Sequence, residues 1–277
     1  HNRQSIKTKG IRSPHDRMIW KSLVLLSLIV VEGSEAFSAG RCGSLPTPAS
    51  HRAHKTKTST SSLQTVSRDV YDDVDAKSAF GTRRYWDELY TGMGDFPKDE
   101  YSWYCGWDAI KPYLSRVVPP NTRKRILVPG IGNDPILVPL WKAGYRNLVA
   151  FDYSEHAIER QQDLLWFEGS ALADSVELHQ LDARSLPEQW TDSFDVVLEK
   201  GVLDAIYLSG DEDNLRSAVG EMRRVSKETG GILVSVSGVV PNTIRRELFP
   251  AAEWTWIRDG AADKEVGCFI FQSKPDN

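Results

Sequence analysis

The sequence has few of the residues that build metal centres and disulfide frameworks. Only three of its 277 residues are cysteines, Cys42, Cys105 and Cys268, and none of them forms a C-x-x-C pair. Only two of the six histidines, His156 and His179, lie beyond residue 70. Structural zinc needs about four closely spaced Cys or His ligands, so a zinc site is excluded and we expect no bound metal. Three cysteines are also too few for a disulfide scaffold. A histidine-based acid/base centre likewise has little to draw on.

Acidic residues are scarce at the beginning of the chain and abundant in the rest. Residues 1–70 contain 11 Lys and Arg against 4 Asp and Glu, whereas residues 71–277 contain 23 against 34. An acidic body argues against nucleic-acid binding, which uses a basic face. A basic leader before an acidic domain is typical of a targeting segment. We therefore expect a presequence over residues 1–70 and one domain over residues 71–277.

The leader has two parts. Residues 18–36 contain a nine-residue apolar run, LVLLSLIVV, which is typical of a secretory signal and shorter than the about 20 residues that a membrane-spanning helix needs. Residues 37–70 are rich in Ser, Thr and basic side chains, as in a transit peptide. This order resembles the bipartite presequences of algae with complex plastids and predicts a plastid location. A secretory location, or a cytoplasmic one if the leader is not translated, remains an alternative.

From Tyr71 onward, apolar runs of strand length alternate with longer amphipathic segments. Strands are expected at 125–129, 147–151, 176–180, 194–198 and 232–236, and helices at 135–143, 154–167 and 213–227. Two late strand-like runs, 254–257 and 266–271, have no helix between them and predict an antiparallel hairpin. The predicted fold class is α/β: a Rossmann-like, seven-stranded, mostly parallel sheet with helices on both faces and this C-terminal hairpin.

The first expected strand runs into a glycine loop that is typical of a nucleotide site. Gly130 and Gly132 allow a sharp turn and a close approach to a ligand, and the helix start offers unpaired N–H groups. Asp152, at the end of the next strand, is placed to accept hydrogen bonds from ribose hydroxyls. Pro135 stands where a dinucleotide loop has its third glycine, which favours adenosine without pyrophosphate. Asp182 is placed either to bind the adenine amino group or to lie solvated in its loop.

Four segments occur in the order seen in one group of methyltransferases. They are Tyr85–Tyr90 (YWDELY), Ile126–Asn133 (ILVPGIGN), Phe151–Ser154 (FDYS) and Phe194–Ala205 (FDVVLEKGVLDA). Together they resemble class I S-adenosylmethionine-dependent methyltransferases, and above all the methyltransferase-like group that contains the elongation factor 1-alpha lysine methyltransferases. The resemblance implies S-adenosyl-L-methionine as cofactor and the transfer of a methyl group, first of all to a protein lysine.

The resemblance also implies cofactor roles for matching residues. Gly130 and Gly132 would lie against the methionine part of the cofactor, and Asp152 would hold the ribose. Asp182 and the Ala183 backbone would contact adenine. The full set of implied cofactor-binding residues is Gly130, Gly132, Asn133, Asp152, Tyr153, Asp182, Ala183 and Glu199, with Trp86 and Tyr90 on a first helix that closes over the site.

The resemblance implies fewer roles for residues that would contact the methyl acceptor. Glu199, at the end of the fourth strand, would face both the cofactor and the incoming nucleophile and is the candidate catalytic residue. Lys200 would shape the loop beside it and is a candidate substrate residue. Trp103 and Tyr104 are candidates for an aromatic wall that tolerates a cation, with packing into the core as the alternative reading.

Three positions depart from the group's pattern. Ile131 stands where the group commonly has Cys, Glu199 where it has Asp, and Leu89 where it often has Arg. Loss of the arginine removes a partner for the cofactor carboxylate. Asn133 and the loop N–H groups can take the place of that arginine. Alternatives to a protein-lysine methyltransferase are a small-molecule methyltransferase, a non-catalytic interaction protein and, disfavoured by Pro135, a nicotinamide-dependent oxidoreductase. The expected partner is a protein substrate such as a translation factor, without nucleic acid or stable membrane insertion.

Overall fold

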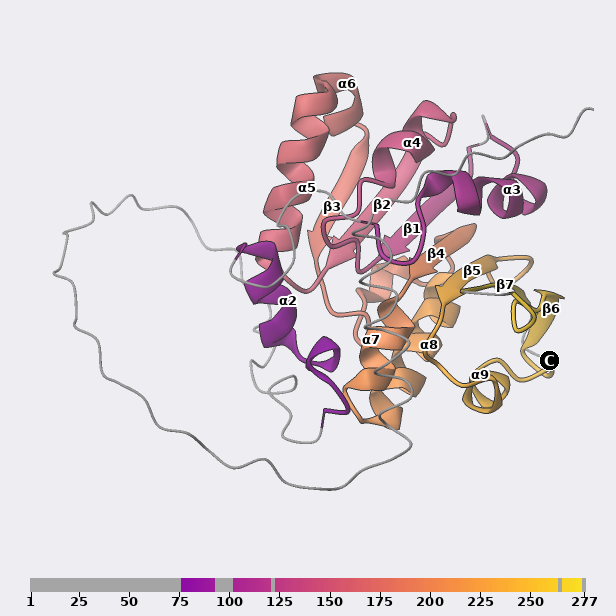
Figure 1. Cartoon of the computed structure of the whole chain (residues 1–277). Coiled ribbons are helices and arrows are strands. Elements are labelled where there is room, and N and C mark those ends of the chain that lie inside the picture. The colour runs from indigo at the N-terminus through magenta and orange to yellow at the C-terminus, as the bar shows by residue number, and fades with distance from the viewer. Residues whose placement is uncertain (1–75, 93–101, 121–122, 264–265, 276–277) are drawn as a thin grey trace, which may run out of the picture. The chain divides into compact units, whose positions relative to one another are not determined.

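The computed structural model describes residues 76–92, 102–120, 123–263 and 266–275 (Figure 1). The predicted presequence, with its signal-like and transit-like parts, lies outside these ranges. Among the described residues, no helix has both the length and the apolar character that crossing a membrane requires.

One seven-stranded sheet, in the order β3-β2-β1-β4-β5-β7-β6, organises the described residues. The strands are β1 (Arg125–Pro129), β2 (Asn147–Asp152), β3 (Val176–Gln180), β4 (Val196–Lys200), β5 (Ile232–Ser237), β6 (Trp254–Arg258) and β7 (Gly267–Ser273). Strands β1 to β5 pair in parallel, whereas β7 runs antiparallel to both β5 and β6. The predicted fold class, including the antiparallel C-terminal hairpin, is confirmed.

The helices are α2 (Arg83–Tyr90), α3 (Trp107–Val117), α4 (Leu137–Lys142), α5 (Glu155–Glu168), α6 (Ser170–Ala173), α7 (Val202–Leu208), α8 (Glu212–Val225) and α9 (Asn242–Leu248), with short 3-10 turns η1 (Ala79–Gly81) and η2 (Glu188–Trp190). Helices α2 and α3 precede the first strand, α4 to α8 connect the parallel strands, and α9 follows the last of them. The helices expected at 135–143, 154–167 and 213–227 correspond to α4, α5 and α8. The sequence analysis did not predict α6, α7 or α9.

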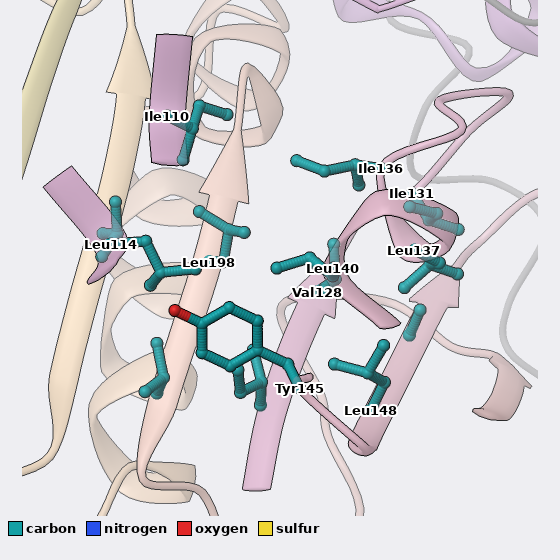
Figure 2. Packing of buried hydrophobic residues seen from close by; sticks show 14 of the residues in the cluster. Ile110, Leu114, Val128, Ile131, Ile136, Leu137, Leu140, Tyr145, Leu148 and Leu198 are labelled. Carbon is teal, nitrogen blue, oxygen red and sulfur yellow. The ribbon is translucent and has the colours of Figure 1, made fainter. Parts of the chain in front are cut away.

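Successive residues of the strands enter two hydrophobic clusters on opposite faces of the sheet. Ile126 and Val128 pack with α3, α4 and α5, while Leu127 packs with α7 and α8. Figure 2 shows the first cluster around Tyr145, whose hydroxyl donates a 2.7 Å hydrogen bond to the Val118 carbonyl. Each fully buried aliphatic side chain contributes about 1.5–3 kcal/mol to folding. Packing on both faces therefore fixes the sheet that carries the site.

The strand order reverses direction at β1, which lies between β2 on one side and β4 on the other. In open α/β sheets, ligands bind at the carboxyl ends of the strands beside such a switch point. The predicted glycine loop follows β1, and Glu199 lies near the carboxyl end of β4. The topology thus brings the two main predicted features to one edge of the sheet.

Candidate active site

The loop after β1 turns at two glycines in the left-handed backbone region. Gly130 and Gly132 both have φ +53°, a conformation that other residues adopt only with strain. A Cβ on Gly130 would collide with the Val202 side chain, and one on Gly132 would lie 2.5 Å from the Tyr90 hydroxyl. Both positions therefore require glycine, because of the backbone conformation and because Val202 and Tyr90 pack directly against the loop.

Asp152, at the end of β2, holds this loop in place. Its Oδ2 accepts a 2.9 Å hydrogen bond from the Gly132 amide, and its Oδ1 accepts one of 2.9 Å from the Ser154 amide. The side chain is buried, and burial raises its pKa to about 6. Because each carboxylate oxygen has two lone pairs, both oxygens keep an acceptor position for the two hydroxyls of a ribose.

Helix α2 lies against the same loop. The Asp87 carboxylate accepts a 2.6 Å hydrogen bond from the Ser154 hydroxyl, and the Tyr90 hydroxyl lies beside Gly132. Trp86 stacks on Tyr90 with ring centroids 6.1 Å apart. Burial raises the pKa of the Tyr90 phenol well above its usual range. The structure therefore brings the predicted helix residue Tyr90 onto the predicted glycine loop, with Trp86 stacked on it.

The predicted adenine side follows β3. Asp182 and Ala183 are both buried there. The Asp182 carboxylate pairs with the Arg184 guanidinium at 2.7 Å, so a bound adenine would share this carboxylate with an arginine. The sequence analysis did not identify Arg184, and the adenine contact stays a prediction.

Tyr153 and Asn133 directly follow Asp152 and Gly132 in the chain. Tyr153 is half-buried, and the Arg83 guanidinium lies 5.6 Å from its ring centroid. Asn133 is buried and borders a cavity of about 110 Å³ against α5. That cavity is also lined by Arg160, Gln161, Asp163, Leu164 and Phe167. Both residues are close to the glycine loop, and their cofactor contacts stay predictions.

Glu199 is fully buried on β4. The Ser235 hydroxyl on β5 donates to its Oε1, and the Leu203 amide lies 3.4 Å from its Oε2 as a second donor. Burial raises the pKa of the carboxyl to about 7, and neighbouring Asp204 adds to that rise. A carboxyl with this pKa exchanges a proton near neutral pH, as the predicted catalytic role requires. Strand β4 runs through Glu199 to Lys200, two residues past the expected end.

Lys200 faces inward and joins β4 to the glycine loop. Its ammonium lies 2.5 Å from the Asp134 carboxylate and donates a 2.7 Å hydrogen bond to the Trp103 carbonyl. The side chain is 8% exposed. Lys200 thus has buried partners, and its predicted substrate contact stays a prediction.

Trp103 and Tyr104, the two candidate wall residues, lie in different surroundings. Trp103 packs edge-on against Phe80 and Trp86, with ring centroids 5.7 and 5.4 Å apart. Tyr104 has φ +65°, and its hydroxyl donates a 2.6 Å hydrogen bond to Asp204. Trp103 therefore belongs to the aromatic cluster under α2, whereas Tyr104 lies on the Glu199 side of the site.

The sequence analysis missed a buried polar cluster behind Glu199. Its members are Asp204, Ser235, Ser237 and Arg245, each no more than 2% exposed. Two serines in the otherwise apolar run ILVSVS were the available signal, because a buried hydroxyl needs a hydrogen-bond partner.

Comparison with known proteins places the chain among methyltransferases. A methyltransferase-domain family model matches residues 139–257. The protein-lysine N-methyltransferase EFM4 of Saccharomyces cerevisiae is 30% identical over 176 residues, which cover 57% of this chain and 75% of the yeast protein. EEF1A lysine methyltransferase 4 of Mus musculus is 32% identical over 154 residues, 54% of this chain and 56% of the mouse protein. The human eEF1A lysine and N-terminal methyltransferase is 28% identical over 155 residues, 56% of this chain.

This chain spans only part of several curated relatives, 20% of the human protein and 56% of the mouse protein. Among solved structures, the glycopeptide N-methyltransferase MtfA complexed with S-adenosyl-L-homocysteine aligns with a TM-score of 0.52 at 15% identity, over 70% of this chain and 98% of MtfA. The [4+2]-cyclase SpnF also aligns with a TM-score of 0.52 at 15% identity, over 70% of this chain and 95% of SpnF. These structural likenesses show the fold alone, because one fold carries several activities.

The match to the yeast protein, together with the fold, decides the class. The chain belongs to the class I S-adenosylmethionine-dependent methyltransferases. Within that class, its sequence is similar to the group that contains the eEF1A lysine methyltransferases.

Proposed function

We propose that this chain transfers a methyl group from S-adenosyl-L-methionine to a lysine side chain of a protein. One observation carries the proposal: a buried carboxyl that titrates near neutral pH, Glu199, lies one strand away from the glycine loop that Asp152 holds. The similarity to the yeast protein-lysine N-methyltransferase supports lysine as the acceptor.

The residues at the switch point fit this cofactor. Gly130 and Gly132 would let the loop backbone approach the methionine part, and Asp152 has acceptor positions for both ribose hydroxyls. When bound, the cofactor supplies a methyl group on a positively charged sulfur. A nucleophile attacks the carbon of this methyl group without further activation of the cofactor. The first task of the protein is therefore to hold donor and acceptor in line and to exclude water.

Its second task concerns the proton of the acceptor. A lysine ammonium has no free lone pair, so the amine must lose a proton before it can attack. Burial in the site lowers the pKa of such an amine. The Glu199 carboxylate, which accepts from the Ser235 hydroxyl and the Leu203 amide, would orient the amine and take that proton.

Calorimetric titration of the full chain tests the cofactor assignment. We expect micromolar binding of S-adenosyl-L-methionine and no binding of NADH. The reverse result would revive the oxidoreductase reading. Binding of the methyl donor without transfer to any protein would favour a small-molecule acceptor or a non-catalytic protein.

Tritiated methyl donor tests the acceptor. The names of the relatives make eEF1A the first protein to offer. Label on eEF1A that amino-acid analysis recovers as methyl-lysine would support the proposal, and label on another residue type would refute lysine as the acceptor.

The location and the domain division are further parts of this proposal. The composition of residues 1–70 supports a bipartite plastid presequence followed by a methyltransferase domain over residues 71–277. A plastid enzyme would meet a plastid elongation factor instead of the cytosolic one, so that protein should be offered as a second acceptor. Fusion of residues 1–70 to a fluorescent protein in an alga with complex plastids tests the address. Retention in the secretory pathway would contradict it.

A further inference from the structure

Asp204, on α7, is the buried acceptor of hydrogen bonds from two distant segments. Its Oδ2 accepts from the Tyr104 hydroxyl at 2.6 Å and from the Gly238 amide at 2.8 Å. Its Oδ1 accepts from the Ser237 hydroxyl at 2.5 Å and from the amides of residues 239 and 240 at 3.1 and 2.9 Å. The residue is 2% exposed. One carboxylate thus holds the segment before α3 and the turn after β5 together.

A buried arginine lies behind this carboxylate. Arg245 on α9 donates a 2.6 Å hydrogen bond to the Ser237 hydroxyl, and its guanidinium lies 3.9 Å from the Phe269 ring centroid. Ser237 therefore accepts from the arginine while it donates to Asp204. A buried carboxylate that lacks compensation is costly, and this one has five donors and a cation one hydroxyl away. We refer to Asp204, Tyr104, Ser237 and residues 238–240 as the Asp204 clamp.

Tyr104 is held in a strained backbone conformation by its surroundings. Its φ of +65° is rare for a bulky residue and persists only where the rest of the structure fixes it. Its ring lies between two glycines, so that a Cβ on Gly201 or Gly238 would be 3.3 or 3.4 Å from the ring. Gly201 is two residues beyond Glu199. The clamp therefore sets Tyr104 against the chain that leaves the candidate catalytic strand.

We propose that Asp204 is a positioning residue for the methyl acceptor, because it fixes the Tyr104 ring and the 238–240 turn beside Glu199. The inference rests on the proposed function. Since Asp204 takes the phenol hydroxyl, Tyr104 presents to an acceptor its ring and no free donor. A ring suits the alkyl stem and the cationic amine of lysine better than a polar small molecule. The hydrogen bonds of Asp204 join residues 104 and 237–240 and not the glycine loop, so the cofactor side should depend on the clamp less than the acceptor side does.

Three variants of the full chain test this role. Asp204→Asn removes the charge, Tyr104→Phe removes one donor, and the double variant combines them. Asp174→Asn, at an exposed aspartate outside the clamp, is the matched control. Three quantities are measured: the dissociation constant of S-adenosyl-L-methionine, KM and kcat with eEF1A as the methyl acceptor, and amide hydrogen exchange at residues 238–240.

We expect the affinity for S-adenosyl-L-methionine to stay within about twofold of wild type in all variants, as in the control. KM for eEF1A should rise about tenfold in Tyr104→Phe and at least as much in Asp204→Asn, the scale of one lost hydrogen bond to a charged group. The double variant should be no worse than Asp204→Asn, because both changes act through one contact. Amide exchange at 238–240 should accelerate in Asp204→Asn and stay unchanged in Tyr104→Phe.

If cofactor affinity falls by the same factor as the KM for the acceptor rises, or if the two effects add in the double variant, the clamp is only a structural element and the proposal is overturned. Tyr104→Phe leaves four donors on Asp204, so it decides the question if Asp204→Asn does not fold: an unchanged KM refutes the role. A wild-type protein that binds no S-adenosyl-L-methionine refutes the proposed function instead. A wild-type protein that binds it but methylates neither eEF1A nor the plastid elongation factor removes the acceptor role and overturns the proposal.

Discussion

The two halves of the sheet's carboxyl edge are assembled in different ways. On the β1–β2 side, Asp152 binds the amides of Gly132 and Ser154, which are 20 and 2 residues away. On the β4–β5 side, Asp204 binds Tyr104, which is 100 residues away, and residues 33 to 36 positions later in the chain. We call the β1–β2 side, where we propose that the cofactor binds, the cofactor half, and the β4–β5 side the acceptor half. The contacts of Asp152 join residues close in the chain, whereas those of Asp204 join residues far apart in it. Changes in one half should leave the function of the other half measurable.

Replacing the candidate base should impair turnover more than cofactor binding. In Glu199→Gln we expect turnover to fall about 10²–10⁴-fold, the usual contribution of a positioned acid or base, and cofactor affinity to fall much less, because the amide has nearly the same shape as the carboxyl. Radiolabelled methyl transfer and calorimetry measure the two quantities. Full activity in this variant would remove Glu199 from the mechanism.

The same variant should change how stability depends on pH. Folding raises the pKa of Glu199 from 4.5 to about 7, so folding favours the protonated form. The contribution of this group to the free energy of unfolding is fully present below pH 4.5 and is lost as the pH rises through about 7, a change of about 3 kcal/mol. Denaturant unfolding between pH 5 and 8 should therefore show a shallower decline in Glu199→Gln than in wild type. An equal decline in both proteins would mean that the carboxyl titrates normally.

A substitution in the glycine loop should break the cofactor half alone. In Gly132→Ala the new Cβ would need φ +53° and would push against the Tyr90 hydroxyl, so we expect cofactor affinity to fall about 100-fold, or about 3 kcal/mol. Gly220→Ala is the control, because that glycine lies in α8 with open space at its Cβ, and it should stabilise the fold by up to about 1 kcal/mol. Unchanged affinity in Gly132→Ala would mean that no ligand approaches the loop.

Asp152→Ala should weaken cofactor binding by about 1–3 kcal/mol, since the ribose hydroxyls lose their acceptor. The pKa of this carboxyl is about 6 in the free protein, and only the ionised form accepts from both hydroxyls. Affinity of wild type should therefore fall as the pH drops from 7 to 5, while Asp152→Asn should show no such dependence. Calorimetry across this range would refute the assignment if wild type and Asp152→Asn behaved alike.

The smallest expected effect comes from Ser235→Ala. The Ser235 hydroxyl stabilises the ionised form of Glu199, so its loss should raise the pKa of that carboxyl further. The acidic limb of the pH–rate profile should move to higher pH by less than about one pH unit, and turnover at high pH should stay close to that of wild type. An acidic limb that moves to lower pH would contradict the hydrogen bond.

The elements of the cofactor half could be predicted because their signals are local. The apolar strands, the glycines after the first of them and the acidic end of the second all lie within about 30 residues, the size of one βαβ unit. The acceptor half offered no such signal. Helix α7 has only seven residues, which is shorter than the window of about 11–18 residues in which a helical period can be recognised, and Asp204 within it reads as one more acidic side chain.

The ends of β4 show why boundaries were misplaced. The strand was expected over 194–198 from its apolar run, yet it begins at Val196 and extends through Glu199 and Lys200. Asp195 still bonds to β1, because its carboxylate accepts from the Arg125 amide and from Lys124 and its own amide donates to the Arg125 carbonyl. The two charged residues at the other end stay in the strand because Ser235 and Asp134 give them partners, and hydrophobicity alone does not reveal such partners.

The Lys200–Asp134 ion pair sets a condition on any redesign of this domain. It is one of the contacts between the strand bearing Glu199 and the loop that would bear the cofactor, and both side chains are less than a tenth exposed. Removal of one partner leaves the other charge buried without its ionic partner, which costs up to about 3–5 kcal/mol. Grafting an acceptor half from another methyltransferase onto this scaffold, to change what is methylated, must therefore transfer positions 134 and 200 as a matched set.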